Sequence, residues 1–297
     1  MNNEIITIEQ ELHNIAAAFE QAGLYYGHGT ETAWDEAAWL LAHALGLSPQ
    51  NGQLQQGTPI SVSQIKRIRE IADLRIETRK PLAYLINSAW FCGLEFYVDE
   101  RVIVPRSPIA ELIANDFKPW VSQTPRHILD LCTGCGCIAI ACAVQFPEAV
   151  VWATDINLSA LDVARVNIER HGVKDRIALY EADLFDGLPE QKFDLIICNP
   201  PYVDAADMAQ LPPEFGHEPA QALAAGKDGL VFVRRILHDA VNFLPPDGVL
   251  VCEVGNSQNT LCEAYPRWPF TWIEFEHGGF GVFALTAGEL EKGRSLE

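Results

Sequence analysis

The sequence predicts an α/β fold in which a small helical domain precedes a seven-stranded, mostly parallel sheet. Over the last two-thirds of the chain, short apolar runs alternate with helical patterns, as expected for strands buried on both faces of a parallel sheet. The first 80 residues instead repeat apolar side chains every three or four positions, as amphipathic helices do. A hydrophobic content of 48% and a charged content of 21% are ordinary for a globular chain of 297 residues.

Three amphipathic helices are expected in the helical domain, over about residues 4–21, 32–46 and 61–80. Thr32 is a suitable N-cap for the second helix, and Ser61 forms a capping box with Gln64 at the start of the third. An interior loop rich in Gln and Gly is expected over 50–58. Pro81 ends the third helix because proline cannot continue it.

The chain is expected to divide into four parts. These are a helical domain, a β-hairpin connector, an α/β domain and a short polar tail, over residues 1–81, 82–106, 107–288 and 289–297. Gly93 lies between two apolar segments and predicts the hairpin. The run Val102 to Val104 predicts a further short strand before Pro105.

Glycines and acids follow three successive strands, at the edge where open α/β sheets bind ligands. Thr133 to Cys137 is a glycine loop before a helix, where the backbone can approach a ligand and the helix offers free N–H groups. Asp155 ends the second strand and can accept from both hydroxyls of a ribose. Asp183 follows the third strand and can accept from an adenine amino group, whose face Leu184 can cover. The loop lacks the third glycine of the dinucleotide fingerprint, which makes a hydride-transfer dehydrogenase a poor match.

The fourth strand ends in a stiff polar corner, Asn199-Pro200-Pro201-Tyr202. Two consecutive prolines cannot donate to a sheet ladder, and Asn199 is held extended by the proline after it. The Asn199 side-chain oxygen and the Pro200 carbonyl can accept both hydrogens of a planar amino group, on which Tyr202 can stack. An Asn-Pro pair alone indicates an ordinary turn, so the corner is informative only together with the cofactor half before it.

This corner, with the segments Ala89 to Gly93 and Val102 to Arg106, resembles the enzymes that methylate glutamine side chains in the translation apparatus. Three segments, Tyr26 to Thr30, Trp34 to Ala37 and Pro105 to Ile109, resemble one bacterial branch of this protein-(glutamine-N5) methyltransferase family, whose substrate is large-subunit ribosomal protein three. The sister branch acts on peptide-chain release factors and usually has Arg-Pro-Glu-Thr in the last of these segments. The resemblance covers about Tyr25 to Leu285.

The resemblance implies a class I, Rossmann-like methyltransferase sheet and the cofactor S-adenosylmethionine. It implies cofactor binding by Asp130, Thr133, Gly134, Cys135, Gly136, Asp155, Ile156, Asp183, Leu184 and Asn199. It implies catalytic roles for Asn199, Pro200 and Tyr202. It implies substrate binding by Asn199, Pro200, Pro201, Tyr202 and Glu218, and by the helical domain. The family usually has Ser where Cys135 stands, and some relatives have an aromatic residue where Leu184 stands.

The charge distribution favours a basic partner, because the formal net charge is −19. Residues 61–80 are an exception, with six basic and three acidic side chains, and we expect this helix to help dock the substrate. The expected substrate is a basic ribosomal protein, either free or in an assembling ribosomal particle. Stable nucleic-acid and membrane partners are not expected, since clustered Lys and Arg are otherwise lacking. The sequence carries no signal of an oligomeric state.

Three alternatives remain open at the level of sequence. One is the sister activity on release factors. Another is an amino methyltransferase that uses the same corner on a flipped base of a nucleic acid. The third is a non-catalytic ribosome-assembly protein with a relic fold, which the intact Asp155 and Asn199 disfavour.

The cysteines and the amino terminus favour a reduced, cytoplasmic protein. Eight cysteines in 297 residues do not form a disulfide framework, and Met1 to Glu11 lacks the basic start of a secretion signal. Cys132, Cys135 and Cys137 have no second pair at zinc-finger spacing, so no metal site is expected.

Overall fold

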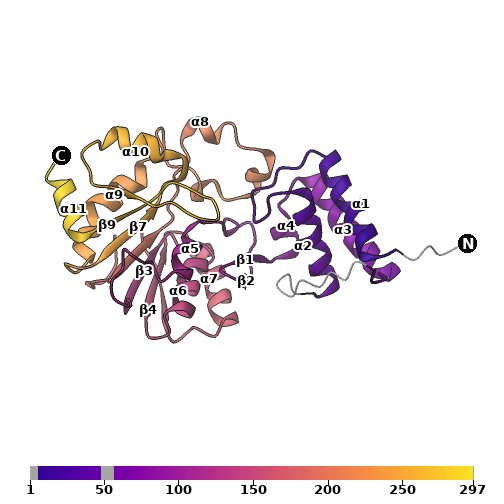
Figure 1. The fold of residues 1–297 in the computed structure, drawn as a ribbon, viewed down its shortest axis with the longest axis horizontal. Helices are drawn as coiled ribbons and strands as arrows, with labels where there is room; N and C mark the ends of the chain where they lie inside the picture. Colours follow the sequence, from indigo (N-terminus) through magenta and orange to yellow (C-terminus); the bar gives the residue numbers. More distant parts are fainter. Residues whose placement is uncertain (1–5, 48–56, 297) are drawn as a thin grey trace, which may run out of the picture. The chain divides into compact units, whose positions relative to one another are not determined.

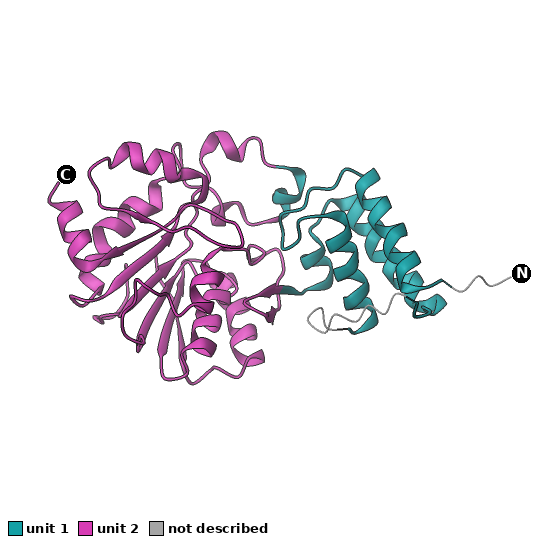
Figure 2. Cartoon of the chain, viewed as in Figure 1, with its two compact units in different colours: residues 1–89, 212–217 teal, residues 90–211, 218–297 magenta. Residues whose placement is uncertain are grey.

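The computed structural model describes residues 6–47 and 57–296, so most of the predicted loop over 50–58 lies outside the described residues. The chain forms two compact units (Figure 2). The smaller unit comprises residues 1–89 and 212–217, and the larger unit comprises residues 90–211 and 218–297. The smaller unit therefore contains a short segment from the second half of the chain, which the sequence did not predict.

The smaller unit is helical, as expected. Its helices are α1 (Ile8–Gln21), α2 (Ala33–Leu45), α3 (Val62–Thr78) and α4 (Leu82–Ile86). The predicted caps are confirmed: Thr32 accepts from the Asp35 N–H, and Ser61 and Gln64 form a capping box. Helix α4 begins directly after Pro81, where the connector was expected, because proline is compatible with the start of a helix.

The predicted hairpin around Gly93 is present as a two-stranded sheet of β1 (Ala89–Phe91) and β2 (Leu94–Phe96). The strand predicted at Val102 to Val104 is wrong, because this segment has no strand pairing. The apolar pattern of this segment reflects the burial of its two valines and not strand pairing. The Val104 N–H donates to the Glu218 carboxylate at 3.0 Å instead of to a neighbouring strand.

The larger unit contains the predicted seven-stranded sheet (Figure 1). Its strands are β3 (His127–Leu131), β4 (Val150–Asp155), β5 (Ile177–Glu181), β6 (Leu195–Cys198), β7 (Val249–Glu253), β8 (Thr271–Trp272) and β9 (Val282–Thr286). Their order is β5-β4-β3-β6-β7-β9-β8, and β9 is antiparallel to both of its neighbours. From β3 the chain first adds strands on one side of the sheet (β4, β5) and then on the other (β6, β7). The point between β3 and β6 where this order reverses is where sheets of this kind bind ligands.

Helices cover both faces of this sheet (Figure 1). They are α5 (Ile109–Ala114), α6 (Cys137–Gln145) and α7 (Leu158–Arg170) on one side, α9 (Val231–Asp239), α10 (Gln258–Ala264) and α11 (Ala287–Arg294) on the other, and the short α8 (Ala205–Met208) in a loop. Single 3-10 turns cover Pro213–His217, Ala220–Ala222, Ala240–Phe243 and Gly255–Ser257. None of the described helices is long and apolar enough to cross a membrane.

The polar tail predicted over 289–297 is mostly helix α11. A capping box of Thr286 and Glu289 begins the helix, and Leu290 is completely buried. The helix was not predicted because only a few apolar residues, in one narrow stripe, are buried, and the rest of the segment is polar.

Candidate active site

A cavity of about 250 Å³ opens in the larger unit at the carboxyl ends of the central strands. It is lined by six of the residues predicted to hold the cofactor, namely Gly134, Asp155, Ile156, Asp183, Leu184 and Asn199. Asn199 and Pro201 of the predicted corner line the same cavity. The fold thus brings residues from four strand ends into one site.

The glycine loop owes its shape to two glycines with left-handed backbone conformations. Gly134 has φ +56°, lines the cavity and donates its N–H to Asp155 Oδ2 at 3.0 Å. Gly136 has φ +83° and begins α6, and a Cβ there would lie 3.2 Å from the Cβ of Ala164 on α7. Cys135 is buried, and its carbonyl accepts from Asn167, so Cys135 supports the loop without lining the cavity.

Asp130 lies near the end of β3 and is completely buried. Its Oδ2 accepts from the Thr133 hydroxyl at 2.5 Å and from the Ala139 N–H at 3.1 Å. Burial raises the pKa of Asp130 to about 7, although these two hydrogen bonds oppose the shift. Its Oδ1 has no hydrogen-bond partner among the described residues, although Asp130 itself does not line the cavity.

Asp155 is the last residue of β4, and its carboxylate lines the cavity. Oδ1 accepts from the Asn157 N–H at 2.9 Å, and Oδ2 accepts from Gly134. Burial raises the pKa of Asp155 above its ordinary value, while these backbone N–H groups oppose the shift. Each oxygen keeps a lone pair for a further donor, which suits the paired hydroxyls of a ribose.

Asp183 is half-exposed and is held by Arg235 of α9, whose Nη1 lies 2.8 Å from Asp183 Oδ1. The next residue, Leu184, has φ +57° and is buried against the cavity. Sequence reasoning found Asp183 from its place after a strand. It missed Arg235, which is 52 residues away along the chain, because no local pattern links the two.

The corner after β6 offers two acceptors. Asn199 lines the cavity, Pro200 is buried, and in the described chain no residue donates to the Asn199 side chain or the Pro200 carbonyl. Tyr202 is mostly buried and does not line the cavity. Its hydroxyl donates to Glu253 Oε1 at 3.2 Å, so stacking of Tyr202 on a substrate does not match the arrangement found.

Glu218 was predicted to contact the substrate, but its side chain is completely buried. Arg106 donates to both of its oxygens at 2.6 Å, and the Val104 N–H donates to one of them at 3.0 Å. With both oxygens engaged, Glu218 fixes the segment around Arg106 and does not itself reach a ligand. The side chain of Arg106 is itself only 26% exposed.

Several cavity residues have no clear signal in the sequence. Phe232 of α9 lines the cavity, as do Arg101, Gln221 and Ala222. Gln221 and Ala222 belong to the loop after the corner, from which only Glu218 was predicted to reach the substrate. Phe232 looks like any other apolar residue at the start of an amphipathic helix.

The eight cysteines are all free thiols, and Cys198 and Cys252 at the sheet centre are completely buried. Among the described residues, no group of three or more His, Cys, Asp or Glu side chains is placed to hold a metal ion.

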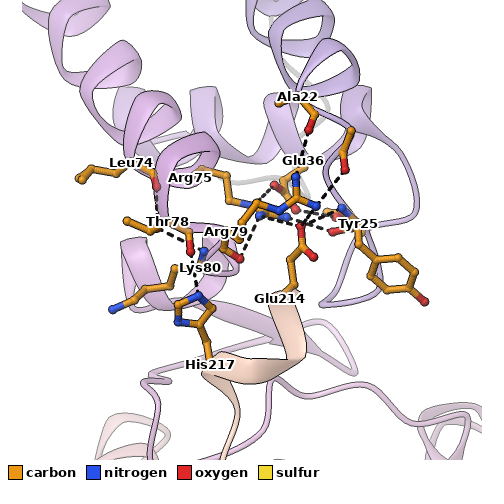
Figure 3. A network of polar contacts seen from close by, with 12 residues as sticks. Ala22, Tyr25, Glu36, Leu74, Arg75, Thr78, Arg79, Lys80, Glu214 and His217 are labelled. Carbon is orange, nitrogen blue, oxygen red and sulfur yellow. Dashed lines mark hydrogen bonds and ion pairs between the residues drawn. The ribbon is translucent and has the colours of Figure 1, made fainter. Parts of the chain in front are cut away.

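A buried charge network ties segment 212–217 into the helical unit (Figure 3). Glu214 is completely buried, and its Oε1 accepts from the Tyr25 N–H at 2.9 Å. Arg79 Nη2 lies 2.8 Å from the same oxygen, and Arg75 Nη1 lies 3.5 Å from it. Arg75 is also buried and pairs with Glu36 at 2.7 Å.

This network reduces the basic charge that residues 61–80 expose, and docking of the substrate by α3 stays a prediction. Arg75 and Arg79 neutralise buried acids, and Arg69 forms two hydrogen bonds to the buried Glu11, at 2.6 and 2.8 Å. The exposed cations on α3 are Lys66, Arg67 and Arg69, of which Arg69 is bound to Glu11. Sequence counting overstated the surface charge because it cannot distinguish internal arginines from external ones.

Comparison with known proteins shows which family the chain resembles over most of its length. The Methyltransferase small domain family matches residues 110–263, which is more than half of the chain, and the PrmC N-terminal domain family matches residues 12–86. A ribosomal protein uL3 glutamine methyltransferase of Francisella tularensis is 44% identical over 292 residues, covering 98% of this chain and 93% of that protein. A protein of the same name from Neisseria gonorrhoeae is 44% identical over 289 residues, covering 97% of this chain and 96% of that protein.

Among solved structures, the hMettl16 catalytic domain in complex with MAT2A 3'UTR hairpin 6 is similar, with a TM-score of 0.52 and 20% identity. The match covers 77% of this chain and 83% of that chain, and at this identity it supports the fold alone. The family models and the two relatives at 44% identity show that the chain belongs to the ribosomal protein uL3 glutamine methyltransferase family.

Proposed function

We propose that this protein transfers a methyl group from S-adenosylmethionine to the side-chain amide nitrogen of a glutamine in ribosomal protein uL3. The observation that carries the proposal is the shared cavity. Asp155 and Gly134 line one part of it, and Asn199 and Pro201 line another. A donor site and an acceptor corner at adjacent strand ends provide what a direct transfer requires.

The cofactor would be held by the first three strand ends. Asp155 would accept from the ribose hydroxyls, and Asp183, fixed by Arg235, would accept from the adenine amino group. The free Oδ1 of Asp130 fits a buried hydrogen-bond donor of the cofactor. Bound there, S-adenosylmethionine would supply the methyl group as an electrophile.

The corner would orient the glutamine. An amide nitrogen is a poor nucleophile because its lone pair is delocalised. Asn199 Oδ1 and the Pro200 carbonyl would accept its two hydrogens and direct the lone pair at the methyl group, which lowers the barrier by positioning and electrostatics. As the new N–C bond forms and the S–C bond breaks, one N–H proton becomes acidic and leaves to solvent, so no strong base is needed beforehand.

The substrate side of the proposal rests on charge as well as on relatives. A net charge of −19 attracts a basic ribosomal protein and repels nucleic acid. The substrate can be free uL3 or uL3 in an assembling ribosomal particle, and the experiment below tests both forms.

The experiment is methyl labelling with a choice of substrates. The protein would be incubated with methyl-labelled S-adenosylmethionine and unmethylated uL3, a methylation-deficient ribosomal particle, a release factor, or RNA. We expect label on a glutamine of uL3, identified by mass spectrometry, and labelling slower by about 100-fold or more with the Asn199→Ala variant. Label on the release factor or the RNA, or no label at all, would refute the proposal.

A further inference from the structure

Glu253 is a buried carboxyl group that the proposed chemistry does not use. It is the last residue of β7 and is 3% exposed. The parallel register pairs Cys252 of β7 with Cys198 of β6, so Glu253 follows at the same level as Asn199. A buried acid beside the reactive corner costs stability, because burial disfavours its charge.

The carboxylate of Glu253 joins two separate segments of the chain. Its Oε2 accepts from the Ser107 hydroxyl at 2.5 Å, and its Oε1 accepts from the Tyr202 hydroxyl at 3.2 Å. Burial raises the pKa of Glu253 to about 7, while Ser107, Tyr202 and the positive charge of Arg106 oppose the shift. Burial, and then the nearby Glu253, raise the pKa of Tyr202, so its hydroxyl stays a hydrogen-bond donor.

Tyr202 is restrained at its backbone and ring as well. Its carbonyl accepts from the Ser257 hydroxyl at 2.7 Å. A Cβ at Gly255 would lie 2.5 Å from Cε2 of the Tyr202 ring, and a Cβ at Gly229 would lie 2.6 Å from the Tyr202 carbonyl oxygen. Both glycines have positive φ, so the chain closes around Tyr202 where larger residues would not fit.

We propose that Glu253, held by Ser107, is a positioning residue for methyl transfer: it fixes Tyr202 and thereby the direction of the Asn199 and Pro200 acceptors. Only the two prolines separate Tyr202 from Asn199, and their fixed φ angles transmit a displacement of Tyr202 to the acceptors. A misplacement of about 1 Å at a reacting group costs on the order of 100-fold in rate. This inference rests on the proposed function, since it concerns the geometry of the same transfer.

The test uses three variants that remove parts of this arrangement with little change of volume: Glu253→Gln, Ser107→Ala and Tyr202→Phe. For each variant, kcat and KM for uL3 methylation and the affinity for S-adenosylmethionine would be measured. We expect kcat to fall by about 10- to 100-fold, with cofactor affinity within about twofold of wild type. The double variant of Glu253 and Tyr202 should be no slower than the slower single variant, because both act through one contact.

The control is Asp194→Asn, which makes the same carboxylate-to-amide change at the opposite edge of the sheet. Asp194 accepts from the backbone N–H groups of Arg126 and His127, at 2.7 and 2.9 Å. This variant is expected to lose stability but keep its kcat. The pH profile gives a second readout: wild-type kcat should change near pH 7, where Glu253 gains its proton, and the Glu253→Gln profile should lack that change.

The outcomes separate the two proposals. Wild-type protein that fails to label uL3 refutes the proposed function and this inference with it. Active wild type, together with Glu253→Gln and Ser107→Ala variants whose kcat stays within about twofold, refutes this inference alone. If Glu253→Gln does not fold, Tyr202→Phe decides the matter, because it removes only the hydroxyl that donates to Glu253 and leaves the buried carboxylate bonded to Ser107.

Discussion

Replacing Glu214 should loosen the helical unit, because this residue is the centre of a buried charge network. In Glu214→Ala, the Tyr25 N–H loses its acceptor and Arg79 loses its carboxylate partner at 2.8 Å. Arg75 keeps Glu36, so the remaining network stays partly paired. Removing one partner of a buried ion pair costs about 3–5 kcal/mol, a large share of the roughly 5–15 kcal/mol that stabilises a typical domain.

A second variant separates the cost of losing the charge of Glu214 from the cost of losing its hydrogen-bond acceptor. Glu214→Gln keeps the shape of the side chain and an acceptor oxygen for Tyr25 but loses the charge, so we expect a smaller cost of about 1.5–3 kcal/mol. The matched control is Glu70→Gln on the same unit. Glu70 is exposed and lies 3.7 Å from the exposed Lys66, and its replacement should change stability by no more than about 0.5 kcal/mol.

Hydrogen exchange followed by mass spectrometry is the appropriate assay, because it reports on each unit separately. Protection of α3 and of segment 212–217 should fall in Glu214→Ala, while the affinity for S-adenosylmethionine, whose proposed site lies in the larger unit, should not change. Segment 212–217 is continuous with the cavity residues Gln221 and Ala222, so KM for uL3 should rise. Exchange in Glu214→Ala equal to that in Glu70→Gln would refute this reasoning.

Further predictions concern the cofactor, the chemistry, the pH dependence and docking. Asp155→Ala should weaken S-adenosylmethionine binding by about 10- to 100-fold in calorimetry, because the ribose loses charge-assisted hydrogen bonds. Asn199→Ala should lower kcat by about 10²- to 10³-fold with normal cofactor affinity and little change in melting temperature. Because the folded protein binds a proton at Asp130 that the unfolded chain has released, stability should fall as pH rises from about 4 to about 7, and Asp130→Asn should flatten this dependence in urea titrations. Reversing Lys66 and Arg67 to Glu should alter KM for uL3 at low salt and leave kcat unchanged, whereas an equal fall in turnover of a short glutamine peptide would show that α3 matters for folding alone.

The sheet and the helix caps could be predicted from the sequence because their signals are local. A buried strand such as β6 is a continuous apolar run, and Thr32 and Ser61 act on N–H groups three residues away. Asp155 could be found for the same reason, since the carboxyl ends of parallel strands meet at one edge.

The features that could not be predicted depend on partners far away in the chain. Glu218 looks like a solvated loop acid until Arg106 is known to take both of its oxygens, 112 residues away. Arg75 looks like a surface cation until Glu214, 139 residues away, is placed beside it. The burial of Tyr202 likewise depends on Glu253, which lies 51 residues later. No period or spacing encodes such pairs.

The central strand of the site lies between two buried carboxyl groups that lower the stability of the fold. In the sheet, β6 lies between β3 and β7, which carry the buried Asp130 and Glu253, and burial raises the pKa of each to about 7. Apolar residues at these positions would stabilise the fold more, because buried acids disfavour their own ionisation. A fold optimised for stability alone would therefore not keep them. Their positions, one with an unpaired oxygen near the glycine loop and one bonded to Tyr202 of the corner, fit the proposed transfer, in which positioned acceptors on both sides of β6 would hold the reacting groups.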